Sequence, residues 1–410
     1  MAHFALICPP FASHIHSFAV LGEELVRRGH RATFVLNAGA PVRGTELPVE
    51  RVAARAGDPS IDRILRSAIR PSGLLGTLRT IADSAAQTDQ LCAGAPAILQ
   101  RLGADAIIAD QLEPAGGLLG AGLRLPFVSL AVALPINSAP GVVLPFLDWP
   151  YDASPRGLKR VRGAERITRL LSRRQRRVVA SWSDRFALHP QRRTLEDCLS
   201  PYAQIAQVVR GYDFPRPEPM AFVGVGPLRR PAEEAADQPL PFDFHPHRPL
   251  VFATFGTLQG GRIRLFRAIA QACREAGADL LVAHGGQLSP NEAASIGATF
   301  VTDFVPYRAV LKHASLCITH GGSNTVLDAL ACGVPLLVRP VAFDQKGNLA
   351  RVLHHGLGER LAGQGIAAQI RRVLADPTIR DRCLAIAVEI SQAGGRSRAA
   401  DIAEGALARG

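Results

Sequence analysis

The segment Leu316-Cys-Ile-Thr-His-Gly-Gly-Ser-Asn-Thr325 joins an apolar strand to the start of a helix. Its first four residues are typical of a buried strand, and the glycines after His320 leave backbone N–H groups free. Free N–H groups at a helix N-terminus can bind a diphosphate, and the helix dipole favours that negative charge. The same residues also fit an ordinary glycine-rich turn in which Ser323 or Asn324 caps the following helix. The segment therefore predicts a strand–loop–helix unit whose role depends on its surroundings.

Strands and helices alternate on both sides of this segment. In the second half we expect four further elements, at residues 250–255 (strand), 263–276 (helix), 279–284 (strand) and 334–338 (strand). The first half opens with a strand at 3–8, a helix at 15–29 and a strand at 31–36, and two more strands follow at 104–109 and 126–132 around a helix at 115–122. This pattern predicts an α/β protein with two doubly wound, Rossmann-like parallel sheets that face each other across a cleft.

A proline-rich stretch separates the two halves. Residues 226–249 contain six prolines around a charged, alanine-rich middle, which is the composition of an interdomain linker. We therefore expect an N-terminal domain over residues 1–226, a linker over 227–249, a C-terminal domain over 250–395 and a terminal helix over 396–410.

Composition excludes several classes of protein. The 410 residues are 47% apolar and 20% charged, a globular balance that rules out intrinsic disorder and a single small module. The formal net charge of +12 favours anionic partners, namely nucleic acid, an acidic membrane or a phosphorylated ligand. The seven cysteines are scattered and include no Cys-x-x-Cys pair, so we expect neither a disulfide framework nor a metal site.

Targeting signals are not expected. The apolar run Phe4–Cys8 meets Pro9-Pro10 too early for a signal peptide, which predicts a cytoplasmic protein. The longest uncharged stretch, residues 125–147, contains four prolines that would break a spanning helix. We interpret it as a buried strand followed by an apolar loop.

The segment from Phe304 to Leu349 resembles the donor-binding signature of the UDP-dependent glycosyltransferase superfamily. The matching residues occur in the same order and spacing, namely Phe304-Val-Pro306, Leu311, His313, Thr319-His-Gly-Gly-Ser-Asn-Thr325, Asp328, Gly333-Val-Pro335, Pro340, Asp344-Gln345 and Asn348. The chain departs from the family at Phe304, Tyr307, Ser323 and Asp328, where Trp, Gln, an aromatic residue and Glu are common. The resemblance implies the GT-B architecture, in which the N-terminal domain binds the acceptor and the C-terminal domain binds UDP-glucose as donor substrate, with no cofactor. It also implies that the terminal helix can cross back to the N-terminal domain.

The resemblance also implies a role for each matching residue. Phe304 would stack on the uracil, His320 and the backbone after it would hold the diphosphate, and Asp328 would bind the ribose. Asp344 and Gln345 would bind the hexose. The full set of donor-binding residues is Gly256, Thr257, Phe304, Val305, His320, Gly321, Gly322, Ser323, Asn324, Thr325, Asp328, Asp344 and Gln345.

Each of these residues, taken alone, also has an ordinary structural interpretation. Phe304 would be a core residue, Asp328 a solvated helix residue, and Asp344-Gln345 a helix cap. The shared order and spacing of the motifs favour the functional interpretation.

In the first half, His14 lies in Pro9-Pro-Phe-Ala-Ser-His-Ile15, on the loop expected after the first strand. The superfamily carries its catalytic histidine there, and an imidazole titrates near neutral pH and can take a proton from an acceptor hydroxyl. Asp110, at the end of a strand, matches the family's partner aspartate, which would orient the ring. The alternatives are that His14 and Asp110 only cap helices, or that His16 is the base.

A closer resemblance covers most of the chain and is to bacterial zeaxanthin glucosyltransferases. It rests on Ala109-Asp-Gln-Leu-Glu-Pro-Ala-Gly116, Leu125-Pro-Phe-Val-Ser129, Ala133-Leu-Pro135, Asp213-Phe-Pro215, Val225-Gly-Pro-Leu228, Phe255-Gly-Thr-Leu-Gln-Gly260 and Ala342-Phe-Asp-Gln345. It implies an inverting, metal-independent transfer of glucose to the ring hydroxyls of this carotenoid, giving the β-monoglucoside and then the β-diglucoside.

A basic segment suggests contact with a membrane, where such an acceptor dissolves. Residues 156–177 hold ten Lys or Arg and one acid among apolar residues, and they follow an apolar loop, residues 141–150, with Phe146 and Trp149. This pattern is typical of an amphipathic helix on anionic lipid, at the inner face of the cytoplasmic membrane. A solvated basic helix is the alternative; no nucleic-acid-binding motif is present.

Two other functions stay open. The chain could glycosylate another lipophilic alcohol, such as a polyketide or a sterol. It could also be a noncatalytic protein that binds nucleotide sugars or nucleic acid.

Overall fold

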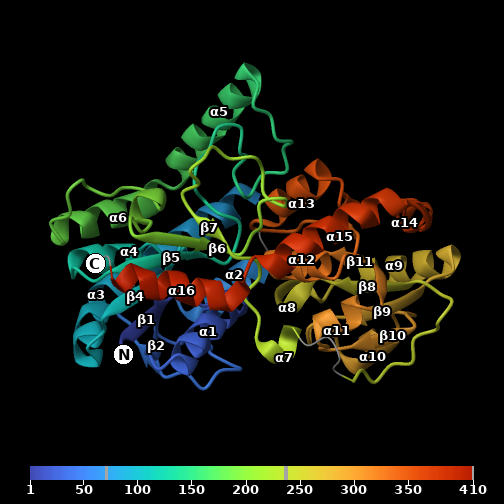
Figure 1. The fold of residues 1–410 in the computed structure, drawn as a ribbon, viewed down its shortest axis with the longest axis horizontal. Helices are drawn as coiled ribbons and strands as arrows, with labels where there is room; N and C mark the ends of the chain where they lie inside the picture. The colour runs from blue at the N-terminus through green and yellow to red at the C-terminus, as the bar shows by residue number, and fades with distance from the viewer. Residues whose placement is uncertain (70–72, 235–238, 409–410) are drawn as a thin grey trace.

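Two parallel β-sheets, each covered by helices, lie side by side in the protein (Figure 1). The computed structural model describes residues 1–69, 73–234 and 239–408. Of the expected linker, residues 235–238 lie outside the described residues, as do residues 409–410 of the expected terminal helix.

The first sheet has seven strands in the order β3-β2-β1-β4-β5-β6-β7. They are β1 (His3–Ile7), β2 (Arg31–Leu36), β3 (Val49–Arg51), β4 (Ala106–Asp110), β5 (Phe127–Ala131), β6 (Ala203–Ala206) and β7 (Val223–Gly224). The strand order reverses between β1 and β4, and ligands of such sheets bind beyond the carboxyl ends of strands at this switch point. The loops after β1 and β4 lead to His14 and Asp110.

The second sheet has six strands in the order β10-β9-β8-β11-β12-β13. They are β8 (Leu250–Thr254), β9 (Asp279–Ala283), β10 (Phe300–Thr302), β11 (Ala314–Thr319), β12 (Leu336–Val338) and β13 (Gly358–Arg360). The order reverses between β8 and β11, so this switch point is formed by the loops that carry Gly256 and His320.

The helices cover both faces of the sheets. They are α1 (Ala12–Arg27), α2 (Ile61–Ile69), α3 (Gly73–Leu102), α4 (Ala115–Gly122), α5 (Pro155–Leu171), α6 (Arg173–Arg185), η1 (Glu196–Cys198), α7 (Pro231–Glu234), α8 (Gly256–Gln259), α9 (Ile263–Ala276), α10 (Pro290–Ala294), α11 (Tyr307–Leu311), α12 (Ser323–Ala331), α13 (Gln345–His354), α14 (Ile366–Ala375), α15 (Pro377–Gln392) and α16 (Gly395–Leu407).

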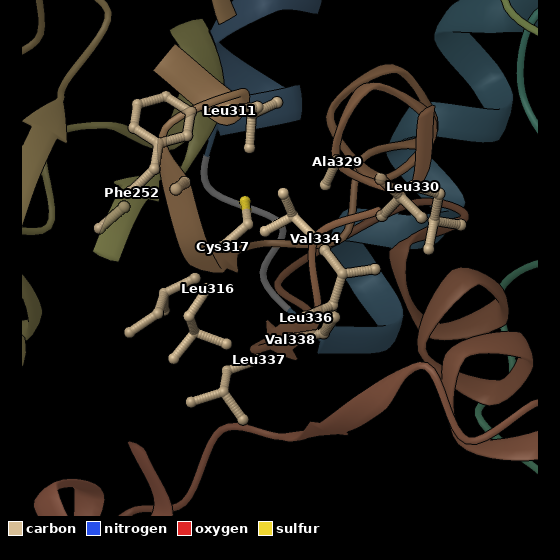
Figure 2. Close-up of a cluster of buried hydrophobic side chains, with 14 of the residues drawn as sticks. Phe252, Leu311, Leu316, Cys317, Ala329, Leu330, Val334, Leu336, Leu337 and Val338 are labelled. Carbon is tan, nitrogen blue, oxygen red and sulfur yellow. The ribbon is translucent and has the colours of Figure 1, made fainter. Parts of the chain in front are cut away.

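The core of the second sheet anchors the helix that follows the glycine-rich segment. Phe252 of β8, Cys317 of β11 and Leu336 of β12 pack with Leu330 of α12, all fully buried (Figure 2). Burial of such side chains stabilises by about 1.5–3 kcal/mol each. The first turn of α12 is therefore held at a fixed position at the end of β11.

Helix α16 packs on the first sheet although it follows the second in sequence. Its Ala399, Ala400, Ala403 and Ala406 are buried in the core cluster of β1, β2 and α1. Arg28 at the end of α1 bonds to Asp401 at 2.6 Å and to Glu404 at 2.9 Å. The chain thus crosses between the two sheets a second time, in Figure 1 as the red helix beside β5 and β6.

Three expectations about elements are corrected by the structure. Helix α1 begins at Ala12 rather than Ile15, because Phe11 O accepts from the N–H groups of His14 and Ile15. The expected loop after β8 contains the short helix α8. The basic segment is two helices rather than one, with a break at Ser172 between α5 and α6.

Candidate active site

His14 and Asp110 lie together at the switch point of the first sheet. Asp110 ends β4, and His14 lies in the first turn of α1 rather than on a loop. The Nδ1–H group of His14 donates to Asp110 Oδ2 at 2.7 Å, and both side chains are nearly buried. The Leu112 N–H group donates to Asp110 Oδ1 at 2.8 Å and fixes the carboxylate. This arrangement leaves Nε2 of His14 as an unprotonated acceptor.

The charge on Asp110 sets the protonation of His14. Burial alone disfavours the imidazolium, but the Asp110 carboxylate, with a smaller contribution from Asp344, raises the pKa of His14 above its ordinary value. Asp344 follows the strands of the second sheet in the chain, so a carboxylate from each half of the chain acts on His14. The site therefore contains contributions from both sheets.

The glycine-rich segment forms a turn between β11 and α12. Gly321 has a φ of 89°, and a Cβ there would lie 2.7 Å from Val338, so only glycine fits. Gly322 is the N-cap residue of α12, and it supplies no side chain to satisfy the N–H groups of Ser323, Asn324 and Thr325. These free donors at the end of a nine-residue helix can bind an anion.

The imidazole of His320 lies beside this turn and is uncharged at neutral pH. Burial, with a smaller effect from the nearby Arg262 cation, lowers the pKa of His320 to about 4. In the absence of a ligand, His320 therefore offers a neutral imidazole to this turn. Gly256 packs against the ring, because a Cβ at Gly256 would lie 3.1 Å from its Cε1 atom. Thr257 follows Gly256 and is exposed.

Phe304 and Val305 differ in exposure. The Phe304 ring is 66% exposed, which excludes the alternative that it is a core residue, and it lies against Gly286. Val305 instead packs its side chain on the core of the second sheet. An exposed ring on a rigid support is suited to stacking on a flat ligand.

Asp344 connects the donor-side helices to the first half of the chain. Its Oδ2 atom accepts from Ser323 Oγ at 2.7 Å, from Asn348 Nδ2 at 3.3 Å and from the Leu134 N–H group at 3.4 Å. Its Oδ1 atom accepts no hydrogen bond from the described residues and can accept a ligand hydroxyl. Gln345 is turned into its own loop, where its Oε1 accepts from the N–H groups of Val341 and Ala342, so only its amide nitrogen is left for a ligand.

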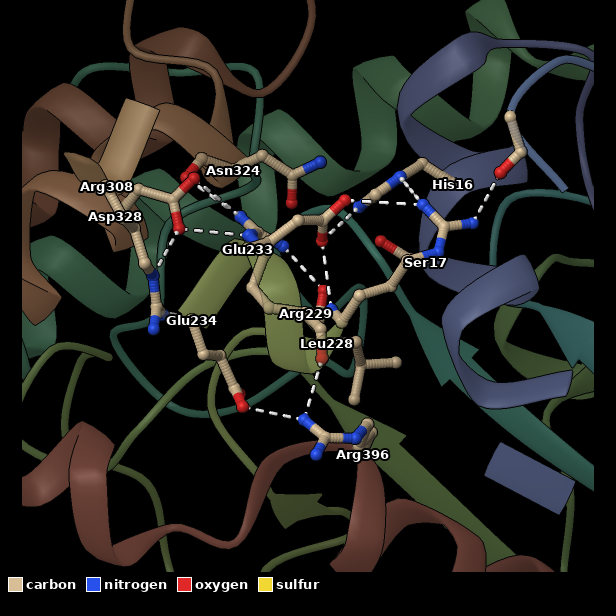
Figure 3. Close-up of polar contacts among 12 residues, drawn as sticks. His16, Ser17, Leu228, Arg229, Glu233, Glu234, Arg308, Asn324, Asp328 and Arg396 are labelled. Carbon is tan, nitrogen blue, oxygen red and sulfur yellow. Dashed lines mark hydrogen bonds and ion pairs between the residues drawn. The ribbon is translucent and has the colours of Figure 1, made fainter. Parts of the chain in front are cut away.

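Asp328 is buried and paired with arginines rather than solvated (Figure 3). Its carboxylate accepts from Arg229 Nε at 2.9 Å, Arg229 Nη2 at 3.1 Å and Arg308 Nε at 3.1 Å. Arg229 comes from the segment between the sheets and also donates to the carbonyl of Asn324 at 3.1 Å. Any ribose contact by Asp328 would have to be made beside these two guanidinium groups.

His16 belongs to a different cluster from His14. Its Nε2 lies 3.3 Å from Glu233, and Arg230 beside it makes a two-bond contact with Glu23 at 2.7 and 2.8 Å. These residues tie α1 to the segment before the second sheet (Figure 3). Of the two histidines, the structure brings only His14 to Asp110.

Comparison with known proteins identifies the family. Residues 205–386 match the model of the family described as UDP-glucoronosyl and UDP-glucosyl transferase. A zeaxanthin glucosyltransferase of Pseudescherichia vulneris is 41% identical, with 100% of this chain and 98% of that protein aligned. One of Pantoea ananas is 39% identical, with 100% and 97% aligned. The chain belongs to this family of glycosyltransferases.

Solved structures of related fold agree with the architecture of this glycosyltransferase. The calicheamicin glycosyltransferase CalG4 superposes with a TM-score of 0.72 at 22% identity, covering 100% of this chain and 99% of that one. The kitacinnamycin glycosyltransferase gives 0.75 at 19% identity, covering 99% of each. The glycosyltransferase has the GT-B architecture that the sequence predicted.

Several residues at the site of the glycosyltransferase were missed from the sequence. Arg229 and Arg308 reach Asp328 from segments 99 and 20 residues away along the chain. Phe11 and Phe343 meet at a ring-centroid distance of 6.0 Å beside His14. Phe11 and Phe343 carried a usable signal, because Phe11 lies three residues before the predicted base and Phe343 directly precedes Asp344 in the motif Ala342-Phe-Asp-Gln345.

Among the described residues, no cluster of three or more His, Cys, Asp or Glu side chains could hold a metal ion. The described helices include none that is long and apolar enough to span a membrane.

Proposed function

We propose that this glycosyltransferase moves glucose from UDP-glucose to the ring hydroxyls of zeaxanthin, giving the β-monoglucoside and then the β-diglucoside. The buried hydrogen bond between His14 and Asp110 is the observation that carries the chemistry. The choice of sugar and acceptor is supported by two full-length relatives that are both named zeaxanthin glucosyltransferase.

In this proposal His14 is the general base. Its Nε2 takes the proton of the acceptor hydroxyl while that oxygen attacks the anomeric carbon, and the bond from this carbon to the UDP oxygen breaks. Asp110 holds the ring and stabilises the imidazolium that forms. Displacement from the opposite side inverts an α-linked donor and gives a β-glucoside.

The C-terminal half would bind the donor. Phe304 would stack on the uracil, and the backbone of Val305 would border it. The N–H groups of Ser323, Asn324 and Thr325, together with His320, Gly256 and Thr257, would hold the diphosphate and stabilise it as it leaves. Asp344 Oδ1 and the amide of Gln345 would bind hexose hydroxyls, and Asp328 with its arginines would border the ribose.

Expression in a zeaxanthin-accumulating bacterium tests this function. Mass analysis of extracted pigment should detect species that carry one and two hexoses, and the His14→Ala variant should abolish both while retaining UDP binding. Unmodified pigment from a wild type that is folded and binds UDP would contradict zeaxanthin as the acceptor and direct the search to other lipophilic alcohols.

We also propose that the glycosyltransferase docks on the inner face of the cytoplasmic membrane through α5 and the start of α6. Ile167 and Leu170 on this helix are 61% and 69% exposed, among arginines that can meet anionic headgroups. The preceding loop adds Phe146, 43% exposed, and Arg160 lies 4.0 Å over the ring of Trp149. Helix α5 projects from the body of the protein in Figure 1, which leaves this face open.

Cosedimentation with vesicles measures this docking. The Ile167→Ser/Leu170→Ser variant should bind anionic vesicles at least several-fold more weakly than wild type, as should neutralisation of Arg173, Arg174, Arg176 and Arg177. The Leu384→Ser/Val388→Ser variant, which changes apolar residues of α15 that are 44% and 56% exposed, is the control. Equal binding by all four proteins would refute the membrane surface.

A further inference from the structure

Two aromatic rings from opposite halves of the molecule meet beside the proposed base. Phe11 precedes α1, and Phe343 lies in the loop between β12 and α13. Their ring centroids are 6.0 Å apart with a tilt of 57°, and the Phe11 ring lies 6.1 Å from the ring of His14. Phe343 directly precedes Asp344, whose charge acts on His14. Each ring is thus part of a loop that carries a residue of the reaction centre.

Packing does not account for Phe343. Its side chain is 43% exposed and belongs to none of the hydrophobic core clusters of the described residues. Its φ of 55° is a left-handed conformation, which is unfavourable for a bulky residue. Strained backbone that the core does not require is concentrated at binding and catalytic sites. The packing of the Phe343 side chain therefore does not explain why its backbone adopts this unfavourable conformation.

The chemistry around Nε2 of His14 selects the kind of acceptor. Because Phe11 lies beside His14 and adjoins Phe343, a hydroxyl bound at this atom would bring its carbon skeleton close to two rings that offer apolar faces and no hydrogen-bonding group. An apolar carbon ring gains from such contact by burial. A strongly polar acceptor would lose hydration there without compensation.

We propose that the adjoining rings of Phe11 and Phe343 form an apolar clamp, on whose shared face the end ring of the acceptor packs so that its hydroxyl reaches His14. The clamp makes these two residues determinants of acceptor specificity, and it rests on the proposed function. Because one ring comes from each half of the protein, the clamp is complete only when the two halves are positioned for reaction.

The Phe343→Gly variant tests the clamp, because glycine keeps the left-handed backbone and removes only the ring. With zeaxanthin in detergent micelles, its KM should rise about tenfold or more, and Phe11→Leu should raise KM less because it keeps an apolar side chain. The Kd for UDP should stay within about twofold of wild type in both variants.

Phe343→Tyr keeps the aromatic face and should restore most of the affinity. Val26→Ala, at a residue of α1 that is 45% exposed, is the control for loss of a surface apolar side chain.

The outcomes separate the clamp from the function on which it rests. Wild-type turnover of zeaxanthin with an unchanged KM in Phe343→Gly overturns the clamp and leaves the function standing. A fall in kcat alone, or an equal loss of UDP affinity, gives Phe343 a structural role and also overturns the clamp. A wild type that binds UDP but does not glucosylate zeaxanthin overturns both proposals.

Discussion

The protonation state of His14 depends mainly on one neighbour, Asp110. Burial would lower its pKa, and the Asp110 carboxylate at 2.7 Å reverses that effect. His320, which is buried without a carboxylate partner, has its pKa lowered to about 4 instead. The pKa values of these two buried histidines are thus shifted in opposite directions.

This contrast predicts the pH profile. Because His14 must be neutral to take a proton and its pKa is raised, kcat/KM should increase with pH through an apparent pKa above 6.5. In Asp110→Asn the raising charge is gone, so the acidic limb should move to lower pH while kcat falls roughly 10²- to 10⁴-fold. Steady-state rates from pH 5 to 9 measure both effects. An acidic limb that stays in place in Asp110→Asn would argue against His14 as the titrating base.

At the scale of elements, the turn between β11 and α12 depends on the absence of a side chain. In Gly321→Ala the Cβ would contact Val338 at 2.7 Å and the Gln345 carbonyl at 3.2 Å, at a φ of 89°. We expect a loss of about 1–3 kcal/mol of stability and weaker UDP binding. Gly363→Ala is the control, since no atom lies within 4 Å of its Cβ. Thermal unfolding and calorimetry with UDP measure the two effects, and equal behaviour of the two variants would refute this explanation.

The buried ion pair between Arg229 and Asp328 of α12 leads to a second prediction. Arg229→Met leaves the buried Asp328 with Arg308 alone, so we expect a loss of about 3 kcal/mol in the free energy of unfolding. Replacing Asp328 by Ala in the same chain should recover part of that loss. Arg360→Ala, which breaks a largely exposed ion pair with Asp148, should cost under about 1 kcal/mol. Denaturant unfolding that gives the same loss for both arginines would contradict the buried-pair account.

Across the whole molecule, the local pattern of apolar residues predicted much of the architecture but few of the contacts between the two halves of the chain. Short continuous apolar runs predicted the bounds of strands β1, β4, β8 and β11 within one or two residues. They could do so because both faces of each strand are buried, so that consecutive side chains are apolar. The order of motifs placed His14 with Asp110, and the structure brings these two side chains together. The arginine pairs of Asp328 and the Phe11–Phe343 contact were not predicted, because they join segments far apart in sequence that leave no local periodic signal.

Helix α16 gives a prediction for the whole molecule. Deleting residues 395–408 would uncover the core around β1 and α1, where four alanines of this helix are buried, and would free Arg28 from Asp401 and Glu404. We expect a protein that is largely insoluble, or that unfolds many degrees lower, in a thermal scan. Deletion of the exposed loop tip residue Gly363 is the control for shortening the chain. A truncated protein with an unchanged unfolding midpoint would show that α16 is dispensable.

The position of α16 also bears on how the protein is made. The ribosome synthesises all residues of the seven-stranded sheet long before it synthesises residues 395–407, which complete the core of that sheet. The core of the first half of the nascent chain therefore lacks the alanines of α16 until the whole second half has been translated, and the apolar face that they cover stays exposed. The final packing of this sheet therefore follows translation of the second half, and a chaperone that shields the unfilled face would act longest on this part of the chain.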